Sequence, residues 1–242
     1  MSSSNASIGA DRQKTWIGRL LDSYKQGLNE KKLNLDDDYI KFIRYGEYFI
    51  EKNGEGILAY ISNNSFIDGV THRQMRKELL ETFDKIYILD LHGNSKKKET
   101  APDGSRDENV FDIMQGVSIN IFVKKRTSGN QKGTLADVFH INLFGERQYK
   151  YTYLAEHQIG SIPWQKLNYK EPYYFFIPKN YEIEEEYNNG FKLNVLFKVS
   201  GSGVKTDRDS LFFDIDRANI ENRFKILTLT FCVETCRSPA LK

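Results

Sequence analysis

The chain has 242 residues, of which 28% are charged and 39% hydrophobic, and its 35 basic and 33 acidic side chains leave a net charge of only +2. This length allows one large or two modest domains with a sizeable core. The small net charge excludes binding to nucleic acid through overall charge, so such a surface requires local clusters of cations. No apolar run approaches the roughly 20 residues that span a membrane, and the polar start lacks a signal-peptide pattern. We expect a cytoplasmic protein.

The residue types needed for metal or nucleophilic chemistry are sparse. Cys232 and Cys236 lie near the carboxyl terminus without paired histidines, which predicts neither a disulfide framework nor a zinc site. No Ser-His-Asp arrangement stands in a supporting motif, and no nuclease-like pattern of carboxylates and lysine occurs. We therefore assign no catalytic, metal or cofactor-binding residue.

Two helices are predicted before the first strand. The first runs from about Asp11 to Gly27, with an apolar stripe formed by Trp16, Leu20, Tyr24 and Leu28. The second runs from about Tyr39 to Lys52. Asp36, Asp37 and Asp38 favour its amino end through the helix dipole, and the Asn53-Gly54 pair ends it.

A strand, a helix and a second strand follow. Gly56 to Ile61 is an apolar run that stops at the polar loop Ser62-Asn63-Asn64-Ser65, and Ile86 to Leu91 is again strand-like. Between them, Thr71 and Gln74 have the spacing of a capping box. After that pair, Met75, Leu79, Leu80 and Phe83 recur at helical spacing. This order predicts a right-handed parallel unit in an open α/β sheet. Sites in such sheets form beyond the carboxyl ends of the strands, where the polar loop lies.

The composition of the remaining chain changes along its length. Val117 to Lys124 reads as a strand, joined to the preceding strand by the charged loop from His92 to Gly116. Beyond a division near Gly129 to Gly133, tyrosine and phenylalanine become dense and prolines interrupt any long element. This composition is typical of a mixed α/β or β-rich module with irregular connections.

Several long motifs resemble those of one protein family and occur in the same order as in that family. These are the SNNSF loop after a strand, the helix HRQMRKELLETF, the strand IYILDLHGN, and APDGSRDENVFDIMQGVSINIFVKK from Ala101 to Lys125. They resemble the later motifs of amino-group adenine DNA methyltransferases, in particular the Type ISP restriction-modification enzymes. Those enzymes join nuclease, helicase, methyltransferase and target-recognition domains in one chain. The resemblance covers roughly Asn5 to Lys225.

The resemblance implies an α/β fold made of the back half of a Rossmann-like methyltransferase sheet, followed by part of a mixed α/β specificity domain. The implied domains are residues 1–128 for the carboxyl-terminal half of the methyltransferase domain and 134–226 for the start of the specificity domain. Residues 227–242 form an atypical tail, which is either a foreign sequence or an exposed edge strand. In the sheet, the Val117 strand would pair antiparallel with the Ile86 strand.

Two motifs of that family do not occur. Neither its glycine-containing turn for S-adenosylmethionine nor its Asn-Pro-Pro-Tyr tetrapeptide is present, and the first proline is Pro102. The nuclease, helicase and front methyltransferase segments would normally lie on the same chain. The implied function is methyl transfer from S-adenosylmethionine to adenine N6 of double-stranded DNA in the complete enzyme. We expect this chain alone to bind no cofactor and to be inactive, with an apolar sheet edge exposed and poor solubility.

Three residues near the polar loop are candidates for contact with the target base. The resemblance places a base-stacking ring near His72, while Asn64 and Ser65 have groups that hydrogen-bond a base edge or a phosphate. The alternatives are a partly exposed histidine in the first turn of a helix, and polar side chains that satisfy backbone amides where strand meets helix.

Cations in two loops are candidates for contact with DNA phosphates. The first set is Lys96, Lys97, Lys98 and Arg106, and the second is Lys205 and Arg208 in a glycine-rich turn. A solvated loop and a tight turn are the alternatives. On the helix after the polar loop, Arg73, Arg76 and Lys77 are interpreted as a solvated face, with a Lys77–Glu81 ion pair. The Glu182–Glu186 run is also read as a solvated helix face. Tyr173 to Phe176 is interpreted as core packing, with stacking on bases as the alternative.

Two other functions stay open on the sequence alone. One is a non-catalytic DNA-binding or recognition polypeptide. The other is an unrelated α/β enzyme whose cofactor binds without a glycine signature.

Overall fold

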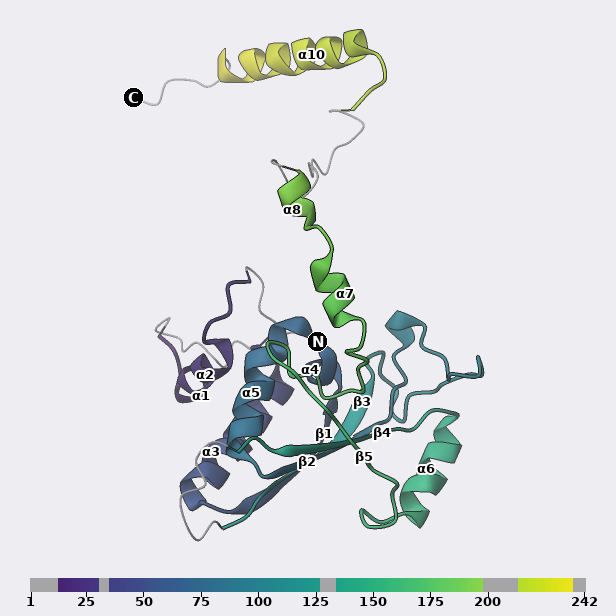
Figure 1. Cartoon of the computed structure of the whole chain (residues 1–242). Coiled ribbons are helices and arrows are strands. Elements are labelled where there is room, and N and C mark those ends of the chain that lie inside the picture. Colours follow the sequence, from purple (N-terminus) through teal and green to yellow (C-terminus); the bar gives the residue numbers. More distant parts are fainter. Residues whose placement is uncertain (1–12, 31–34, 127–133, 198–212, 237–242) are drawn as a thin grey trace. The chain divides into compact units, whose positions relative to one another are not determined.

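The computed structural model describes residues 13–30, 35–126, 134–197 and 213–236 (Figure 1). The chain forms two compact units, one that extends to Tyr181 and one that begins at Glu182. The first unit contains a five-stranded mixed sheet with helices, so the predicted α/β class is confirmed.

The helices ahead of the sheet differ in part from the prediction. The first predicted helix is two short ones, α1 (Trp16–Leu20) and α2 (Asp22–Lys25), while its start lies outside the described residues. They are separated at Leu21, which keeps right-handed helical dihedrals (φ −71°, ψ −10°) and donates its backbone N–H to Ile17 O at 3.1 Å. Helix α3 (Asp38–Asn53) is as predicted, and Gly54 ends it with a φ of 85°, which glycine adopts without strain.

The sheet has the order β1-β3-β2-β4-β5. Its strands are β1 (Gly56–Asn63), β2 (Lys85–Asp90), β3 (Val117–Lys124), β4 (Asp137–Asn142) and β5 (Gln165–Lys166). Strand β3 lies antiparallel between β1 and β2, which therefore run in the same direction. Strand β4 is parallel to β2, and β5 is antiparallel to β4. The predicted directions of the first three strands are confirmed.

The connection from β1 to β2 consists of α4 (Ser65–Asp68), a 3-10 turn η2 (Val70–His72) and α5 (Arg73–Thr82). The predicted capping box is wrong. Thr71 lies inside the 3-10 turn, His72 is the N-cap of α5, and that N-cap makes no side-chain hydrogen bond. The side chain of Gln74 instead donates to Glu78 at 3.4 Å. The predicted apolar face is confirmed, since Met75, Leu79, Leu80 and Phe83 are all buried.

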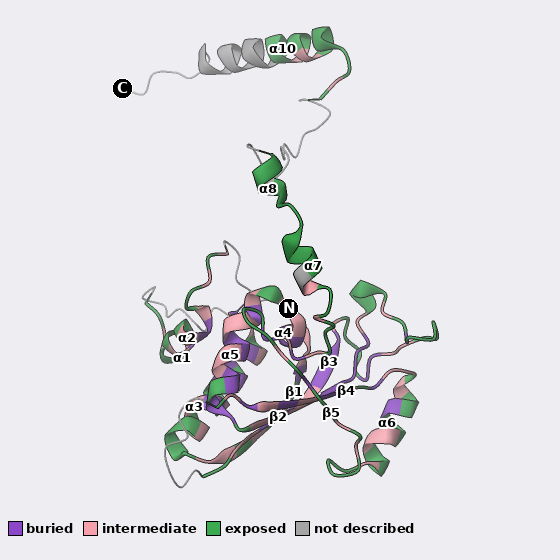
Figure 2. Cartoon of the chain, in the orientation of Figure 1, coloured by how far each residue is buried: buried purple, intermediate pink, exposed green. Residues whose placement is uncertain are grey.

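Two apolar clusters lie in the first unit. The larger joins α3, α4 and α5 to Ile86, Ile88, Phe122 and Val138 of the sheet. The smaller contains residues at the carboxyl ends of β2 and β4, and side chains of α6 (Arg147–Glu156) pack against it. Figure 2 shows the buried positions concentrated in the sheet and on the inner faces of these helices.

Strand β1 is an edge of the sheet and carries exposed apolar side chains. Ile57 is 69% exposed and Ile61 is 48% exposed, on the face of β1 that points away from α3. On the α3 side, Phe42, Tyr45 and Phe49 are also exposed. The predicted exposed apolar edge is therefore present.

The chain beyond β3 continues the first compact unit, and the predicted domain division stays a prediction. Residues 127–133 lie outside the described residues, but β4 and β5 continue the same sheet, and the compact unit extends to Tyr181. The second unit contains α7 (Glu184–Asn189), α8 (Leu193–Leu196) and α10 (Arg217–Cys236). Glu182 and Glu186 are exposed, as predicted.

The tail is helical as far as Cys236, so its interpretation as an edge strand is wrong. An alternating run such as LTLTF is locally compatible with a strand, but a strand needs a neighbour for its backbone groups, whereas a helix satisfies them internally. Among the described residues, no helix has the length and apolar character needed to cross a membrane.

Candidate site at the carboxyl edge of the parallel strands

Three strands that run in the same direction end at one edge of the sheet and deliver polar side chains there. Asn63 ends β1 and Asn64 follows it, Asp90 ends β2, and Asn142 ends β4. Carboxyl ends of parallel strands are where α/β sheets form sites, because the connecting loops diverge there. Two cavities lie along this edge, and Asn63 lines one while Asn64 lines the other.

The first cavity has a volume of about 450 Å³. It is lined by Asp37, Asp38, Tyr39, Ile61, Ser62, Asn63, Lys96, Phe111, Ile113, Gln115 and Val117. These residues come from the start of α3, the end of β1, and the loop between β2 and β3. The loop enters through η3 (Ser95–Lys97) and returns to the sheet at Val117.

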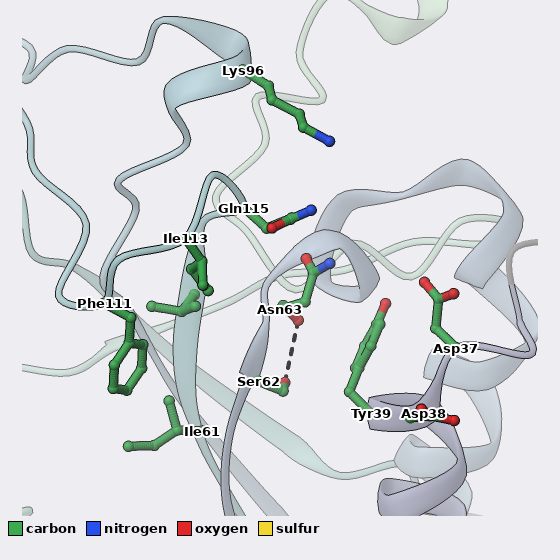
Figure 3. Close-up of a pocket in the computed structure, with 11 residues that line it drawn as sticks. Asp37, Asp38, Tyr39, Ile61, Ser62, Asn63, Lys96, Phe111, Ile113 and Gln115 are labelled. Atoms are coloured by element: carbon green, nitrogen blue, oxygen red, sulfur yellow. Dashed lines mark hydrogen bonds between the residues drawn. The ribbon is translucent and has the colours of Figure 1, made fainter. Parts of the chain in front are cut away.

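The walls of this cavity differ in character (Figure 3). Ile61, Phe111 and Ile113 form an apolar side, and all three side chains are between 42% and 48% exposed. Tyr39 and Asp37 lie on the opposite side, and Asn63 and Gln115 lie between the two sides. Such a space, apolar on one wall and rimmed by amides and carboxylates, suits a flat ring with polar edges.

The polar loop after β1 is largely occupied by its own hydrogen bonds. The Asn63 side-chain oxygen accepts from the Ser65 backbone N–H at 2.9 Å and from the Ser65 hydroxyl at 2.7 Å. Asn64 donates from its side chain to Asp90 at 2.9 Å. Both predicted base contacts, Asn64 and Ser65, therefore already have partners within the protein, and their role stays a prediction.

The second cavity, of about 330 Å³, contains a cluster of titratable side chains. Residues Asn64, Ile67, Asp68, Asp90, His92, Lys97, Glu99, Asn142, Ile177 and Pro178 line it. The His92 ring contacts Glu99 through Nδ1 and Asn142 through Nε2, both at 2.8 Å. Asp90 lies 3.8 Å from the same ring. The imidazole also stacks on Phe144, with 3.8 Å between the ring centroids.

Burial and charge act against each other in this cluster. Burial raises the pKa of Asp90 above its usual range, although His92 and Asn64 oppose it. Burial lowers the pKa of His92, but the hydrogen bond to Glu99 and the charge of Asp90 outweigh it, and the net pKa is raised. Burial raises the pKa of Glu99, yet its hydrogen bonds with His92 and Asn94 leave that pKa lowered. The contacts of His92 with Glu99 and Asn142 tie the start of the loop to the carboxyl end of β4, and Asp90 beside the ring adds the end of β2.

His72 does not line either cavity. It is 6% exposed, and its Nε2 lies 3.4 Å from the Tyr39 hydroxyl. Burial and the charge of Arg76 lower its pKa to about 4, so the ring is neutral. A ring that stacks on an extruded base must present a face to solvent. The structure therefore argues against the predicted stacking role, and also against the alternative of a partly exposed histidine.

The predicted DNA contacts in the first loop are at the surface. Lys96 lines the first cavity, and Lys97 lies 3.8 Å from Asp68 beside the second. Arg106 forms an ion pair with Glu108 at 3.0 Å while its side chain remains 79% exposed. Lys98 is exposed and has a φ of 51°. Lys205 and Arg208 lie outside the described residues, so their role stays a prediction.

The three cations on α5 have different environments. Arg76 is fully buried, so the prediction of a solvated face is wrong for this residue. Arg73 pairs with Glu30. Lys77 lies 3.8 Å from Glu81, so the competing account of an i, i+4 ion pair holds for this residue. Periodicity placed Arg76 next to Met75, Leu79 and Leu80 on the inner half of the helix, a signal that sequence reasoning passed over.

The sequence reasoning also missed the residues that shape the first cavity. Phe111 and Tyr39 were not identified, because neither stands in a polar loop directly after a strand. An aromatic side chain between Asn109 and Asp112 in a charged loop is unusual enough to have been a signal. Within the described residues, no group of three or more His, Cys, Asp or Glu side chains is arranged to hold a metal ion.

Comparison with known proteins gives the fold its context. No protein-family model matches the sequence, and no curated protein does. A solved DrdV–DNA complex is 23% identical with a TM-score of 0.65, over 89% of this chain and 22% of that one. The ATP-dependent Type ISP restriction-modification enzyme LlaBIII bound to DNA is 26% identical with a TM-score of 0.58, over 86% of this chain and 14% of that one.

A third structure is a nuclease-deletion mutant of the Type ISP restriction-modification enzyme LlaGI in complex with a DNA substrate mimic. It is 22% identical with a TM-score of 0.60, over 94% of this chain and 22% of that one. This chain thus spans less than a quarter of the length of each of the three solved chains. Its structural neighbours include Type ISP restriction-modification enzymes bound to DNA, and over most of its length the chain shares their fold.

Proposed function

We propose that this chain is part of a site-specific adenine DNA methyltransferase of a Type ISP-like restriction-modification system. In the complete enzyme, a methyl group would pass from S-adenosylmethionine to adenine N6 in double-stranded DNA. The observation that carries the proposal is the 450 Å³ cavity at the carboxyl edge, with Phe111 on one wall and the amide of Gln115 at its rim. The likeness to enzymes bound to DNA supports it.

The cavity fits an adenine turned out of the helix. Extrusion of a base costs a few kcal/mol, and stacking on an aromatic side chain contributes roughly 1–3 kcal/mol toward that cost. Phe111 offers a ring that is 44% exposed, and Ile61 and Ile113 extend the apolar surface. Amide side chains are the groups that pair with the polar edge of adenine. The target-base contact is therefore assigned to Phe111 instead of His72.

The residues present do not fit the cofactor. The described strands include no glycine-rich turn that could hold a nucleotide-like group, since β1 leads into Asn63-Asn64-Ser65, where these side chains bond to one another and to Asp90. The Asn-Pro-Pro-Tyr tetrapeptide is also absent from the sequence. We assign no cofactor contact to this chain and expect other segments to supply them.

The test uses the full 242-residue chain and two labelled DNA duplexes, one fully paired and one with a single unpaired adenine. The chain should bind the second duplex more tightly, and Phe111→Ala should remove the preference while leaving weak, salt-dependent binding to the paired duplex. Equal affinity of the chain for both duplexes would contradict the base pocket.

A methyl-transfer assay and calorimetry with S-adenosylmethionine address the alternatives. The proposal predicts neither transfer nor tight cofactor binding by this chain alone. Tight cofactor binding would favour the unrelated α/β enzyme. A non-catalytic recognition polypeptide would show preference for a particular paired sequence without any effect of an unpaired adenine.

A further inference from the structure

Four consecutive backbone carbonyls in the loop that bears Phe111 accept hydrogen bonds from one helix. On α6, Lys150 donates to Glu108 O at 2.6 Å, and Tyr151 donates to Val110 O at 2.5 Å. Arg147 donates from Nε to Asn109 O at 2.7 Å and from its terminal nitrogen to Phe111 O at 3.2 Å. The three donors are spaced i, i+3 and i+4, so they share one face of α6.

Residues 107–116 form no helix or regular strand. Near their end, Met114 O and Gly116 O accept from the backbone N–H groups of Ser95 and Asn64. Asn109 supports the loop from within. Its side chain donates to Gly93 O and Gln115 O and accepts from the Phe111 backbone N–H. Gly93 approaches so closely that a Cβ there would lie 2.4 Å from the Asn109 Cα. The loop is thus held from inside by Asn109 and from outside by α6.

The anchor of α6 is a buried ion pair. Lys150 and Asp107 are both fully buried and 2.6 Å apart, and Lys150 also donates to Leu91 O at the end of β2. Asp107 accepts in addition from the backbone of Gly93 and Gly145. A fully satisfied buried pair of this kind has one good geometry, because any displacement leaves a buried charge without a partner.

We infer that α6 is a positioning element for the base pocket, in which Arg147 and Tyr151 hold Phe111 at the cavity wall. This rests on the proposed function and deepens it. Helix α6 belongs to the stretch from residue 134 onward that the sequence assigns to the specificity domain. Hydrogen bonds therefore connect the wall of the pocket to the segment from residue 134 onward, and the position of Phe111 depends on the position of α6.

The test follows the loop and the ligand separately. Arg147→Gln and Tyr151→Phe each remove loop contacts without burying a new charge. Arg126→Gln is the matched control, since Arg126 is 78% exposed and follows β3 at the opposite edge of the sheet. The probes are a duplex with one unpaired 2-aminopurine, an adenine analogue that reports stacking by its fluorescence, and hydrogen exchange of residues 107–116.

Tyr151→Phe should weaken binding of the unpaired probe by roughly fivefold, as expected for the loss of one hydrogen bond. Arg147→Gln, which loses two hydrogen bonds to the loop and an ion pair with Asp112, should weaken it at least as much. Their affinity for the fully paired duplex should equal that of the control variant Arg126→Gln. Hydrogen exchange should rise in residues 107–116 while β2 and β3 stay protected, which a general loss of stability would not produce. Arg147→Lys, which keeps one donor, should fall between wild type and Arg147→Gln.

The outcomes separate the two proposals. If Phe111→Ala abolishes the preference for the unpaired probe but the α6 variants behave like wild type in both measurements, the positioning role is wrong and the base pocket stands. If Phe111→Ala has no effect, the base pocket is wrong. In that case, unchanged hydrogen exchange of residues 107–116 in the α6 variants would also overturn the role of α6. Raised exchange would show that α6 positions the loop, without a role in base binding.

Discussion

The guanidinium of Arg76 donates from Nε to the carbonyl oxygen of Tyr173 at 2.9 Å, which joins α5 to a segment 97 residues later. The same side chain donates to Phe66 O and Gly69 O at 2.7 and 2.8 Å, so it also closes the loop before its own helix. The side chain is fully buried, and burial lowers its pKa to about 9, which leaves it charged at neutral pH. One arginine thus ties the segment around Tyr173 to the centre of the first unit.

Replacement of Arg76 should be strongly destabilising. Arg76→Met leaves several buried carbonyls without a donor and should lower the free energy of unfolding by about 3 kcal/mol or more. Arg76→Lys should recover little, because an ammonium group lacks the planar fork that reaches carbonyls in two directions. Urea denaturation measures both. Lys77→Met, at an exposed site on the same helix, should change stability by less than about 0.5 kcal/mol. A similar loss for Lys77→Met and Arg76→Met would contradict the assignment.

His72 should matter for stability instead of base binding. His72→Ala removes a buried ring and should cost about 1–3 kcal/mol of unfolding free energy. Affinity for a duplex with an unpaired adenine should change little once measured at a temperature where the variant is folded. If His72→Ala lost that affinity while His72→Phe restored it, the stacking role predicted from the sequence would be revived.

His140 should make the protein less stable at acidic pH. Within the part of the chain that the structure describes, neither ring nitrogen has a hydrogen-bond partner. The ring is fully buried, and burial, aided by the charge of His92, lowers its pKa to about 4. The unfolded value is about 6.5, so between these values the unfolded chain binds more protons than the folded one. The free energy of unfolding is therefore not reduced by His140 above about pH 6.5, and it falls as the pH drops toward 4.

The variant His140→Leu should therefore lose less stability than wild type between pH 7 and 4.5. The difference should be on the order of 2–3 kcal/mol, since each pKa unit corresponds to about 1.4 kcal/mol. Thermal unfolding at several pH values provides the measurement, with His157→Gln as the control at a half-buried site. Parallel pH profiles for wild type and His140→Leu would show that another group is responsible.

The exposed edge of β1 should limit solubility. Its eight residues include neither a charged side chain nor proline, the features that usually prevent edge strands from pairing with other chains. Ile57→Lys and Ile61→Lys should reduce aggregation measured by light scattering at fixed concentration. Ile226→Lys, at a site that is 64% exposed on α10, should have a smaller effect. An equal improvement from all three substitutions would attribute it to net charge alone.

Local sequence patterns determined the elements around the site. The apolar run before Ser62, the helical recurrence of Met75 to Phe83, and the glycine at 54 each act within a few residues, so α3, β1, α5 and β2 could be predicted closely. The location of the site at the carboxyl edge followed from the order of these elements alone. Where local signals conflicted, as at Thr71 and in the tail, the prediction failed.

Only the tertiary structure decided which distant groups meet. Periodicity cannot show that β3 enters between β1 and β2, or that β4 continues the same sheet, because strand order depends on pairing between residues far apart in sequence. It also cannot show that Phe111 lies on the cavity wall opposite Tyr39. Nor can it show that Arg147 and Tyr151 bind the loop that carries Phe111. A charged side chain is read as solvated until a fold surrounds it with carbonyls. For that reason the sequence placed Arg76 on the surface and did not single out Lys150. In the structure both side chains are buried, and each links a helix to a distant segment.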